Sequence, residues 1–406
     1  MSNNADNIAG SDQDLCITSL ILQNFRNYER YQLNNISGLT IFVGPNAVGK
    51  TSVIEAIQLI TALRSFRCSQ MNQVVHWNSN SARVQAHLLS AARSLDLSMI
   101  IKSGSRSYSL NGKKKTLHDL RGLLPAVVFC PDDLHLIKGS NGVRRDTLDS
   151  FAIQLSKNFD AVKKDYVTVL KQKNQALKDE VSADYIASIN DIFIRVAAQL
   201  IYFRCIVLGN IQSLLNTLYR EITSTNDKVS VWYQPGWVKY GVGSDVTIND
   251  EQLHSNHDHI IDNLVHNSLP SASQKESYLS YIREKLQHTI NDSLPEERIR
   301  KRSCVGPHVD QILFTINGHD AMHYASQGQQ RSLVLACKLS ELTIMQSKLH
   351  QKPVLLLDDV MSELDENHRG ALMEYISRDI QTFITTTTLD YFPRSIIQRA
   401  DIIHLP

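Results

Sequence analysis

An eight-residue loop over 44–51 carries the clearest chemistry in the chain. It matches the phosphate-binding pattern G-x-x-x-x-G-K-[ST] at every fixed position and consists of Gly44, Pro45, Asn46, Ala47, Val48, Gly49, Lys50 and Thr51. In this pattern the backbone N–H groups of the loop surround the phosphates of a nucleoside triphosphate. Lys50 is expected to reach the β- and γ-phosphates, and the Thr51 hydroxyl is expected to bind Mg²⁺. A glycine-rich turn without this function could match the same pattern.

The segments around this loop have the order that the motif requires. The apolar, β-branched run 39–43 predicts a buried strand, and apolar residues at three- and four-residue spacing predict a helix over 52–63. The N-terminus of a helix favours anions, because its free N–H groups and its dipole both attract negative charge. The sequence therefore predicts a nucleoside-triphosphate site.

Two neighbouring carboxylates supply the second part of this chemistry. The apolar run 354–357 predicts a buried parallel strand, and Asp358 and Asp359 follow it directly. Ligands of open α/β sheets collect at the carboxyl ends of the strands. Asp358 is therefore expected to hold Mg²⁺, and Asp359 to orient or deprotonate an attacking water molecule. A simple cap for the acidic turn 362–365 is the alternative.

A second polar, glycine-bearing loop spans 326–331, directly before an apolar helix predicted over 332–339. Ser326, Gly328 and Gln329 would form a second anion site at a helix N-terminus. One triphosphate motif needs no second site in the same molecule, so this loop is predicted to complete the γ-phosphate site of another copy. A capping turn is the other interpretation.

Several arginines precede or follow the phosphate loop. Arg26 is expected to face the phosphates, although a lone arginine in a turn is more often solvated or ion-paired. Arg64 and Arg67 end the predicted helix, where capping of the helix dipole and contact with nucleotide or DNA are both compatible with the sequence.

Charge and composition limit the possible partners. The 406 residues include 42 basic and 41 acidic side chains, so any DNA-binding surface must be a local patch. The basic candidates are 113–115, Arg144 with Arg145, and 298–302. No apolar run is expected to approach the roughly 18 residues of a membrane span. Scattered cysteines indicate neither disulfides nor zinc, and we expect a cytoplasmic protein without a membrane partner.

A group of histidines and aspartates invites a metal hypothesis, which its spacing does not favour. His254, Asp258 and Asp262 recur at four-residue steps, with His257 and Asp250 nearby, and indicate one solvated helix face.

The changes of pattern along the chain predict an α/β fold with an antiparallel β subdomain and an inserted, mostly helical arm. The expected division is a disordered N-terminus over 1–14, the first part of a nucleotide-binding head over 15–133, the arm over 134–302, and the second part of the head over 303–406. A mixed-charge link over 296–302 is expected to lead back to the head.

The order of these motifs resembles the ATPase heads of ABC and SMC proteins, and most closely the RecF family of bacterial replication and repair proteins. The residues that carry the resemblance are 24–28, 44–51, 129–133 with 138–139 and 144–145, 306–308, 326–331, 358–360 and 362–365. It implies an ABC-type ATPase head that binds ATP and Mg²⁺, with Asp359, Lys50 and Ser326 acting in catalysis.

The resemblance also implies partners and a role. The implied assembly is an ATP-dependent homodimer that clamps single-stranded, duplex or gapped DNA, and the implied partners are recombination mediator proteins. The implied location is the nucleoid. The implied activity is weak, DNA-stimulated ATP hydrolysis that works as a switch in recombinational repair and fork maintenance.

The chain departs from related patterns at three places. Val309 and Gln311 stand where the family usually has an arginine and a carboxylate, 130–133 replaces a transporter glutamine, and Asp359 is one methylene shorter than the transporter glutamate. The alternatives are a transporter-type ATPase subunit, for which Thr385–Thr388 replaces the expected histidine switch, and an SMC-like head, for which a long coiled coil is missing.

Overall fold

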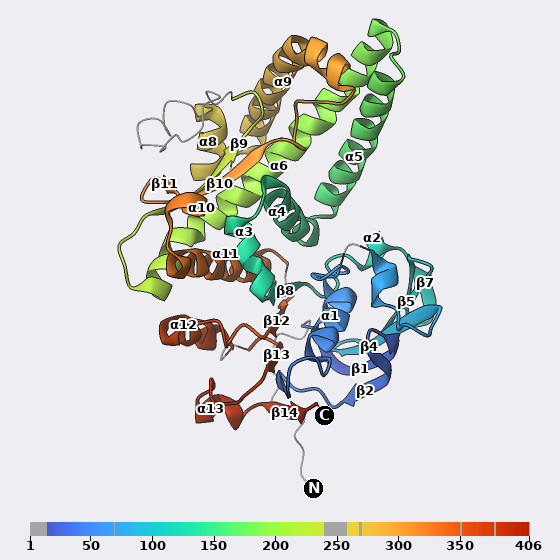
Figure 1. Ribbon diagram of the computed structural model, residues 1–406, viewed down its shortest axis with the longest axis vertical. Coiled ribbons are helices and arrows are strands. Elements are labelled where there is room, and N and C mark those ends of the chain that lie inside the picture. Colours follow the sequence, from blue (N-terminus) through green and yellow to red (C-terminus); the bar gives the residue numbers. More distant parts are fainter. Residues whose placement is uncertain are drawn as a thin grey trace. The chain divides into compact units, whose positions relative to one another are not determined.

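The computed structural model describes residues 14–68, 70–238, 258–267, 270–349, 351–376 and 379–405. The predicted disordered residues 1–13 lie outside this range, as do Asp250, His254 and His257. The chain forms two compact units: a head unit of Met1–Asp133 with Glu341–Pro406, and an arm unit of Leu134–Ser340. Each unit is described by itself, and Figure 1 labels their elements.

The head unit contains two sheets and a few helices. Its strands are β1 (Cys16–Phe25), β2 (Tyr28–Asn34), β3 (Leu39–Val43), β4 (Ser81–Leu89), β5 (Ser94–Lys102), β6 (Ser105–Leu110), β7 (Lys113–Lys115), β8 (Ala126–Phe129), β12 (Val354–Asp358), β13 (Thr382–Thr386) and β14 (Asp401–His404). Its helices are α1 (Lys50–Thr61), α2 (Leu117–Leu120), α12 (Glu366–Ile376) and α13 (Arg394–Ile397), with a 3-10 turn over Met71–Val74.

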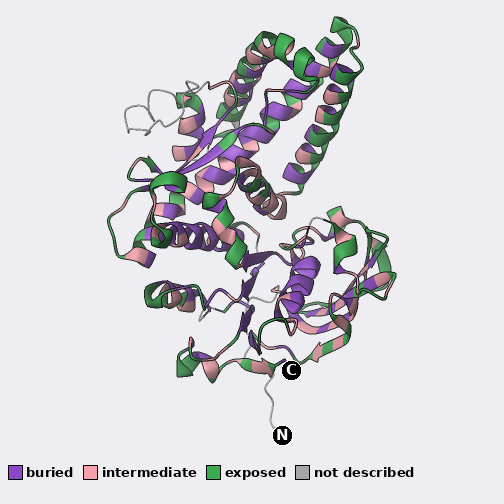
Figure 2. Cartoon of the chain, viewed as in Figure 1, coloured by how far each residue is buried: buried purple, intermediate pink, exposed green. Residues whose placement is uncertain are grey.

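Helix α1 lies between the two sheets of the head unit. One sheet is parallel with the order β14-β3-β13-β12-β8, and the other is antiparallel with the order β2-β1-β4-β5-β6-β7. Helix α1 packs on β12 and β13 of the first sheet and on β1 and β4 of the second (Figure 1). All of its residues but Thr51 are therefore buried, as the purple ribbon in Figure 2 shows.

The register of the parallel sheet brings the predicted site residues together at the carboxyl ends of its strands. Strand β3 leads into the phosphate loop, and Val43 at its end pairs with Thr386. Asp358 ends β12 and pairs with Thr385 of the same neighbouring strand, β13. The predicted strands 39–43 and 354–357 are confirmed, and each is wholly buried, as continuous apolar runs of central parallel strands are.

The antiparallel sheet is the predicted antiparallel β subdomain. Asn111 and Gly112 form a two-residue hairpin turn between β6 and β7, with φ angles of 50° and 74°. Two positive φ angles are typical of the turn that asparagine-glycine favours. The basic candidate 113–115 therefore forms the short edge strand β7, in which Lys113 and Lys114 are exposed.

The arm unit is mostly helical. Its elements are α3 (His135–Lys138), α4 (Asn141–Leu155), α5 (Lys157–Lys178), α6 (Ala183–Thr223), β9 (Val229–Gln234), α8 (His259–His266), α9 (Ala272–Arg300), β10 (Gln311–Ile316), β11 (His319–Asp320) and α10 (Ala321–Tyr324). Helix α11 (Gln327–Lys348) crosses the boundary between the units. Residues 303–340 lie in the arm unit because β10 pairs with β9; the predicted division into domains stays a prediction.

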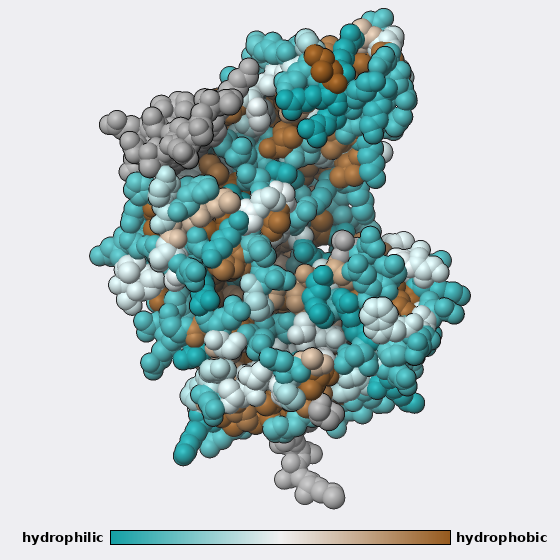
Figure 3. Space-filling view, in the orientation of Figure 1, coloured by the Kyte–Doolittle hydropathy of each residue, from teal (hydrophilic) through white to brown (hydrophobic). Residues whose placement is uncertain are grey.

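Helix α6 is the central element of the arm unit and contradicts one expectation. It contacts α5, α8, α9 and β9. It also contains an 18-residue window with a mean hydropathy of 1.8, so it is long and apolar enough to cross a membrane, and the expectation that no run approaches that length is wrong. Since 61% of this window is buried, its apolar residues form a protein core. The face of the arm seen in Figure 3 is mainly hydrophilic.

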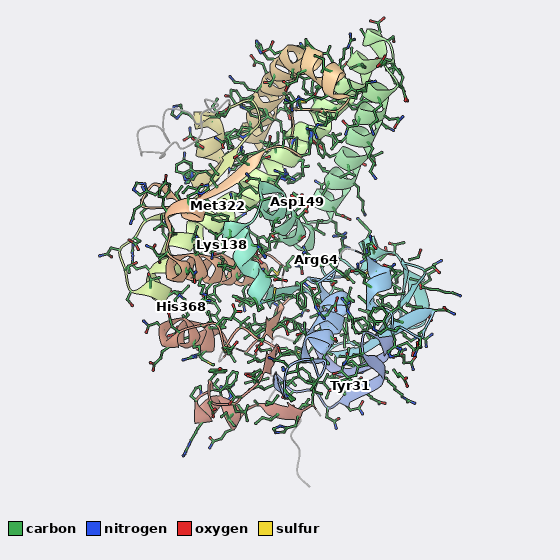
Figure 4. All side chains as sticks on the ribbon, in the orientation of Figure 1. Tyr31, Arg64, Lys138, Asp149, Met322 and His368 are labelled. Carbon is green, nitrogen blue, oxygen red and sulfur yellow. The ribbon has the colours of Figure 1, made fainter. Side chains whose placement is uncertain are left out.

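Buried ion pairs join the arm helices. The Asp149 carboxylate on α4, labelled in Figure 4, accepts two hydrogen bonds from Arg204 of α6 at 2.8 and 2.9 Å. Lys173 of α5 pairs with Glu297 of α9 at 2.8 Å, and both side chains are at most 1% exposed. This pair explains why α9 continues past Pro295 to Arg300, where the sequence predicts a mixed-charge link: Glu297 is held by tertiary contacts although proline normally breaks a helix.

Asp258 belongs to the predicted solvated helix face, but it makes specific contacts. It caps α8, and its carboxylate accepts hydrogen bonds from Trp237 and Tyr281, both at 2.8 Å. Asp258 therefore stabilises the arm unit and is not simply a solvated residue of this face.

Candidate functional site

The phosphate loop connects β3 to α1, with Ala47 and Gly49 at positive φ angles of 69° and 109°. Both glycines of the motif exclude a side chain. A Cβ at Gly44 would lie 2.7 Å from the Leu405 carbonyl oxygen, and Gly49 has a φ of 109°, a backbone angle that residues with a side chain rarely adopt. The Lys50 ammonium lies across the loop and donates to the carbonyl oxygens of Gly44 and Pro45 at 2.7 and 2.8 Å. Pro45, Asn46 and Ala47 are exposed, whereas Val48 is half-buried.

The turn after β1 packs against this loop. The Asn27 amide donates to the Val48 carbonyl oxygen at 3.2 Å, and a Cβ at Gly49 would lie 2.7 Å from the Tyr28 hydroxyl. Burial raises the pKa of the Tyr28 hydroxyl to about 12. The second glycine of the motif therefore serves the close approach of Asn27 and Tyr28 as well as the turn.

Thr51 and Asp358 form an oxygen cluster that suits a magnesium ion. The Asp358 carboxylate is 5% exposed and accepts a hydrogen bond from the Thr385 hydroxyl at 2.8 Å. Burial raises its pKa, while hydrogen bonds from Thr385 and Thr51 lower it in part. A buried carboxylate next to a hydroxyl supplies the oxygen ligands that Mg²⁺ prefers, and the positive charge of the ion would favour the ionised carboxylate.

Asp359 directly follows this cluster in a strained conformation. Its φ is 54°, a left-handed angle that costs a non-glycine residue free energy. Its backbone N–H donates to the Thr385 hydroxyl at 2.9 Å, and its Oδ1 is buried without a hydrogen-bond partner among the described residues. Such an acceptor suits a side chain that binds water beside the phosphates.

Glu55 is one of the residues beside this site that the sequence did not predict. It is fully buried on α1 and accepts two hydrogen bonds from the Arg26 guanidinium at 2.8 and 2.7 Å. It also accepts from the Ser65 hydroxyl at 2.5 Å, and Arg67 lies 3.7 Å away. A carboxylate within an otherwise apolar helix face was the available signal. Arg26 is thus ion-paired beside the loop, and its predicted contact with nucleotide stays a prediction.

These elements surround one pocket in the head unit. Its volume is about 1100 Å³, which is large enough for a nucleotide. The lining includes Arg26, Asn27, Asn46, Ala47, Gly49, Lys50, Thr51, Ser52, Arg67, Asn72, Gln73, Val75, His76, Trp77, Ser79 and Asp359. The structure therefore brings together the loop, Arg26 and Asp359, although Asp359 lies more than three hundred residues after the loop.

The second polar loop lies in the arm unit and begins a helix. Helix α11 starts at Gln327, five residues before the predicted start, because Ser326 caps it. The Gln329 N–H donates to the Ser326 hydroxyl at 3.2 Å, and the Ser326 N–H donates to the Gln329 side chain at 2.9 Å. Ser326 and Gly328 are exposed. The local geometry is a capping box; the predicted contact with a second copy stays a prediction.

One of the predicted DNA contacts is wrong. Arg144 is 3% exposed, and its guanidinium donates to the carbonyl oxygens of Leu136, Ile137 and Ile312. It stabilises the arm unit and cannot meet a DNA phosphate. In contrast, 298–302 is exposed throughout.

Comparison with known proteins assigns the chain to a class. Residues 16–398 match the model of the RecF/RecN/SMC N-terminal domain family. The chain is 32% identical over 395 residues to the protein named DNA replication and repair protein RecF from Lactobacillus acidophilus, and covers 96% of it. It is 30% identical over 391 residues to the protein of the same name from Oenococcus oeni, with 95% covered.

A solved structure extends this similarity to the fold. The structure described as the recombination mediator protein RecF with ATP in the RecFOR pathway superimposes with a TM-score of 0.77 at 29% identity, covering 93% of this chain and 94% of that one. The chain therefore belongs to the RecF family within the RecF/RecN/SMC ATPases, and the predicted ABC-type head with a helical arm is confirmed.

Proposed function

We propose that the chain is an ATP-dependent DNA-binding protein of recombinational DNA repair and replication-fork maintenance. The observation that carries this proposal is the grouping of the phosphate loop with Asp358 and Asp359 at one edge of the head's parallel sheet. Family membership and the names of the relatives support it.

Each residue of the pocket has a role in this proposal. The N–H groups of Gly44–Thr51 and the start of α1 bind the phosphates of ATP, and Lys50 leaves its two carbonyl partners for the β- and γ-phosphates. Thr51 and Asp358 hold Mg²⁺, which when bound neutralises phosphate charge. Asp359 orients the attacking water. Because it is shorter than a glutamate, we expect slow hydrolysis that is stimulated by DNA and serves as a switch.

The dimer is the second part of the proposal. The exposed Ser326 loop, with Gly328 and Gln329, contacts the γ-phosphate of ATP held by another copy, so that ATP closes a homodimer on DNA and hydrolysis opens it. Recombination mediator proteins are the proposed partners, in the cytoplasm at the nucleoid, where the dimer helps to load recombinase at gaps. The exposure of Ser326 and Gly328 supports this role, since it leaves the loop accessible to another copy.

The DNA phosphates are proposed to meet the lysines of β7 and the basic residues 298–302, which are exposed except for Lys115. We expect the logarithm of the affinity to fall with the logarithm of salt, by a slope of about 0.9 for each neutralised phosphate. An affinity that does not change between low and moderate salt would contradict these contacts.

A pair of variants tests the nucleotide site and the contact in trans separately. Lys50→Ala is expected to lose ATP binding and ATP-driven dimers together. Ser326→Arg is expected to retain ATP binding to the monomer and to lose the dimers, because the new side chain fills an exposed contact surface. Equal loss of ATP binding in both variants, measured by calorimetry, would contradict the contact in trans.

A further inference from the structure

Trp77 is a large aromatic side chain in an unusual place. It is 96% exposed and yet lines the pocket that contains the phosphate loop. Tryptophan in folded proteins normally buries much of its large surface, so a solvated indole that lines a pocket is available to cover a bound ligand.

The backbone that carries Trp77 is held firmly. Phe25 and Val75 form a β-bridge. On one side of it the Arg26 N–H donates to the Val74 carbonyl oxygen at 2.8 Å, and on the other the His76 N–H donates to the Asn24 carbonyl oxygen at 2.9 Å. The Arg26 guanidinium adds a bond to the Gln73 carbonyl oxygen at 2.8 Å. The indole is therefore presented from a backbone that is fixed to the end of β1.

The pocket has two chemically different walls. The phosphate loop, Thr51 and Asp359 form a charged wall. The other wall comes from the segment 72–79 and consists of Asn72, Gln73, Val75, His76, Trp77 and Ser79, none of which is Asp, Glu, Lys or Arg; Arg26 and Arg67 also line the pocket. A nucleotide has the same division, with charged phosphates at one end and a planar, weakly polar base at the other.

We propose that Trp77 is the base platform of the site and stacks on the purine ring of the nucleotide whose phosphates bind at Gly44–Thr51. This inference rests on the proposed ATP site and adds to it a residue for the base. Stacking of a base on an aromatic ring is worth about tenfold in affinity, which corresponds to about 1.4 kcal/mol. Every purine has a π-face, so Trp77 supplies affinity for both ATP and GTP and little choice between them.

Calorimetric titrations with two probes test the platform in the full-length protein. The probes are ATP and inorganic tripolyphosphate, each with Mg²⁺, because the second has the phosphates without the base. Trp77→Ala is expected to weaken ATP binding about tenfold and to leave tripolyphosphate binding unchanged. Trp77→Phe keeps an aromatic face and is expected to stay within about threefold of wild type for ATP.

Intrinsic fluorescence gives an independent readout. Trp232 and Trp237 are half-buried in the arm unit, so ATP is expected to quench emission from Trp77 in wild type and to quench little in Trp77→Phe. Unchanged ATP affinity in Trp77→Ala, or equal weakening of both probes, would overturn the platform and leave the phosphate site in place. A wild-type protein that binds neither probe would refute the proposed ATP site itself.

Discussion

The buried carboxylate of Glu55 offers the sharpest test of the forces that build the site. The change is Glu55→Gln, which preserves the shape of the side chain and removes its charge. Glu55 is 0% exposed and its partner Arg26 is 19% exposed, with two hydrogen bonds at 2.7 and 2.8 Å between them. In the variant one amide N–H₂ group faces a guanidinium donor, so one of these hydrogen bonds becomes a contact between two donors.

The expected loss of stability follows from this geometry. Removing one partner of a buried ion pair costs about 3–5 kcal/mol, and the partial exposure of Arg26 puts the value near the lower end, at about 3 kcal/mol. For a unit of this size, 1 kcal/mol lowers Tm by about 2–4 °C, so a shift of about 6–12 °C is expected.

Thermal and urea denaturation followed by circular dichroism measure this effect. Arg67→Ala is the matched control, because Arg67 lies 3.7 Å from the same carboxylate but is 41% exposed, and its loss is expected to cost less than about 1 kcal/mol. Equal shifts in the two variants would show that the buried pair with Arg26 does not stabilise the head unit as argued.

Two further predictions concern the loop and the metal ligands. Gly49→Ala is expected to weaken ATP binding more than tenfold, because its φ is 109° and the new Cβ would meet Asn27 and Tyr28 within 2.7 Å, whereas Gly38→Ala, with open space around it, leaves calorimetric binding unchanged. Asp358→Asn is expected to raise Tm at neutral pH in the absence of Mg²⁺ and nucleotide. The pKa of Asp358 is higher in the folded than in the unfolded protein, so ionisation lowers stability as pH rises through the folded value, and the gain over wild type should vanish as pH falls towards 3.8. A gain that persists at that pH would contradict the assignment.

Much of the head unit follows from local patterns in the sequence. The run 354–357 is apolar along its whole length and the run 39–43 is apolar except for Thr40, as is typical of strands covered on both faces, and the motif after the run 39–43 requires the strand, loop and helix that the structure contains. The hairpin at Asn111 and Gly112 was equally predictable, because few other pairs accept two positive φ angles.

Contacts between distant segments were beyond these patterns. The roles of Glu55 and Trp77 depend on partners in other segments, and no spacing rule predicts them. Local propensity also misplaced two helix boundaries. The sequence predicts a link over 296–302, but α9 continues to Arg300 because the buried pair of Lys173 and Glu297 holds this turn. The sequence predicts that the other helix starts at residue 332, but α11 starts five residues earlier, where Ser326 and Gln329 form a capping box.

Sedimentation velocity with Mg²⁺ and ATP is the most direct test of the proposed switch. Wild type and Asp359→Asn are compared with and without a gapped duplex. The account predicts a dimer that forms only with ATP, that is longer-lived in Asp359→Asn because hydrolysis is slowed, and that sediments together with the DNA. A monomer under every condition, in protein that binds ATP by calorimetry, would contradict the ATP-driven clamp.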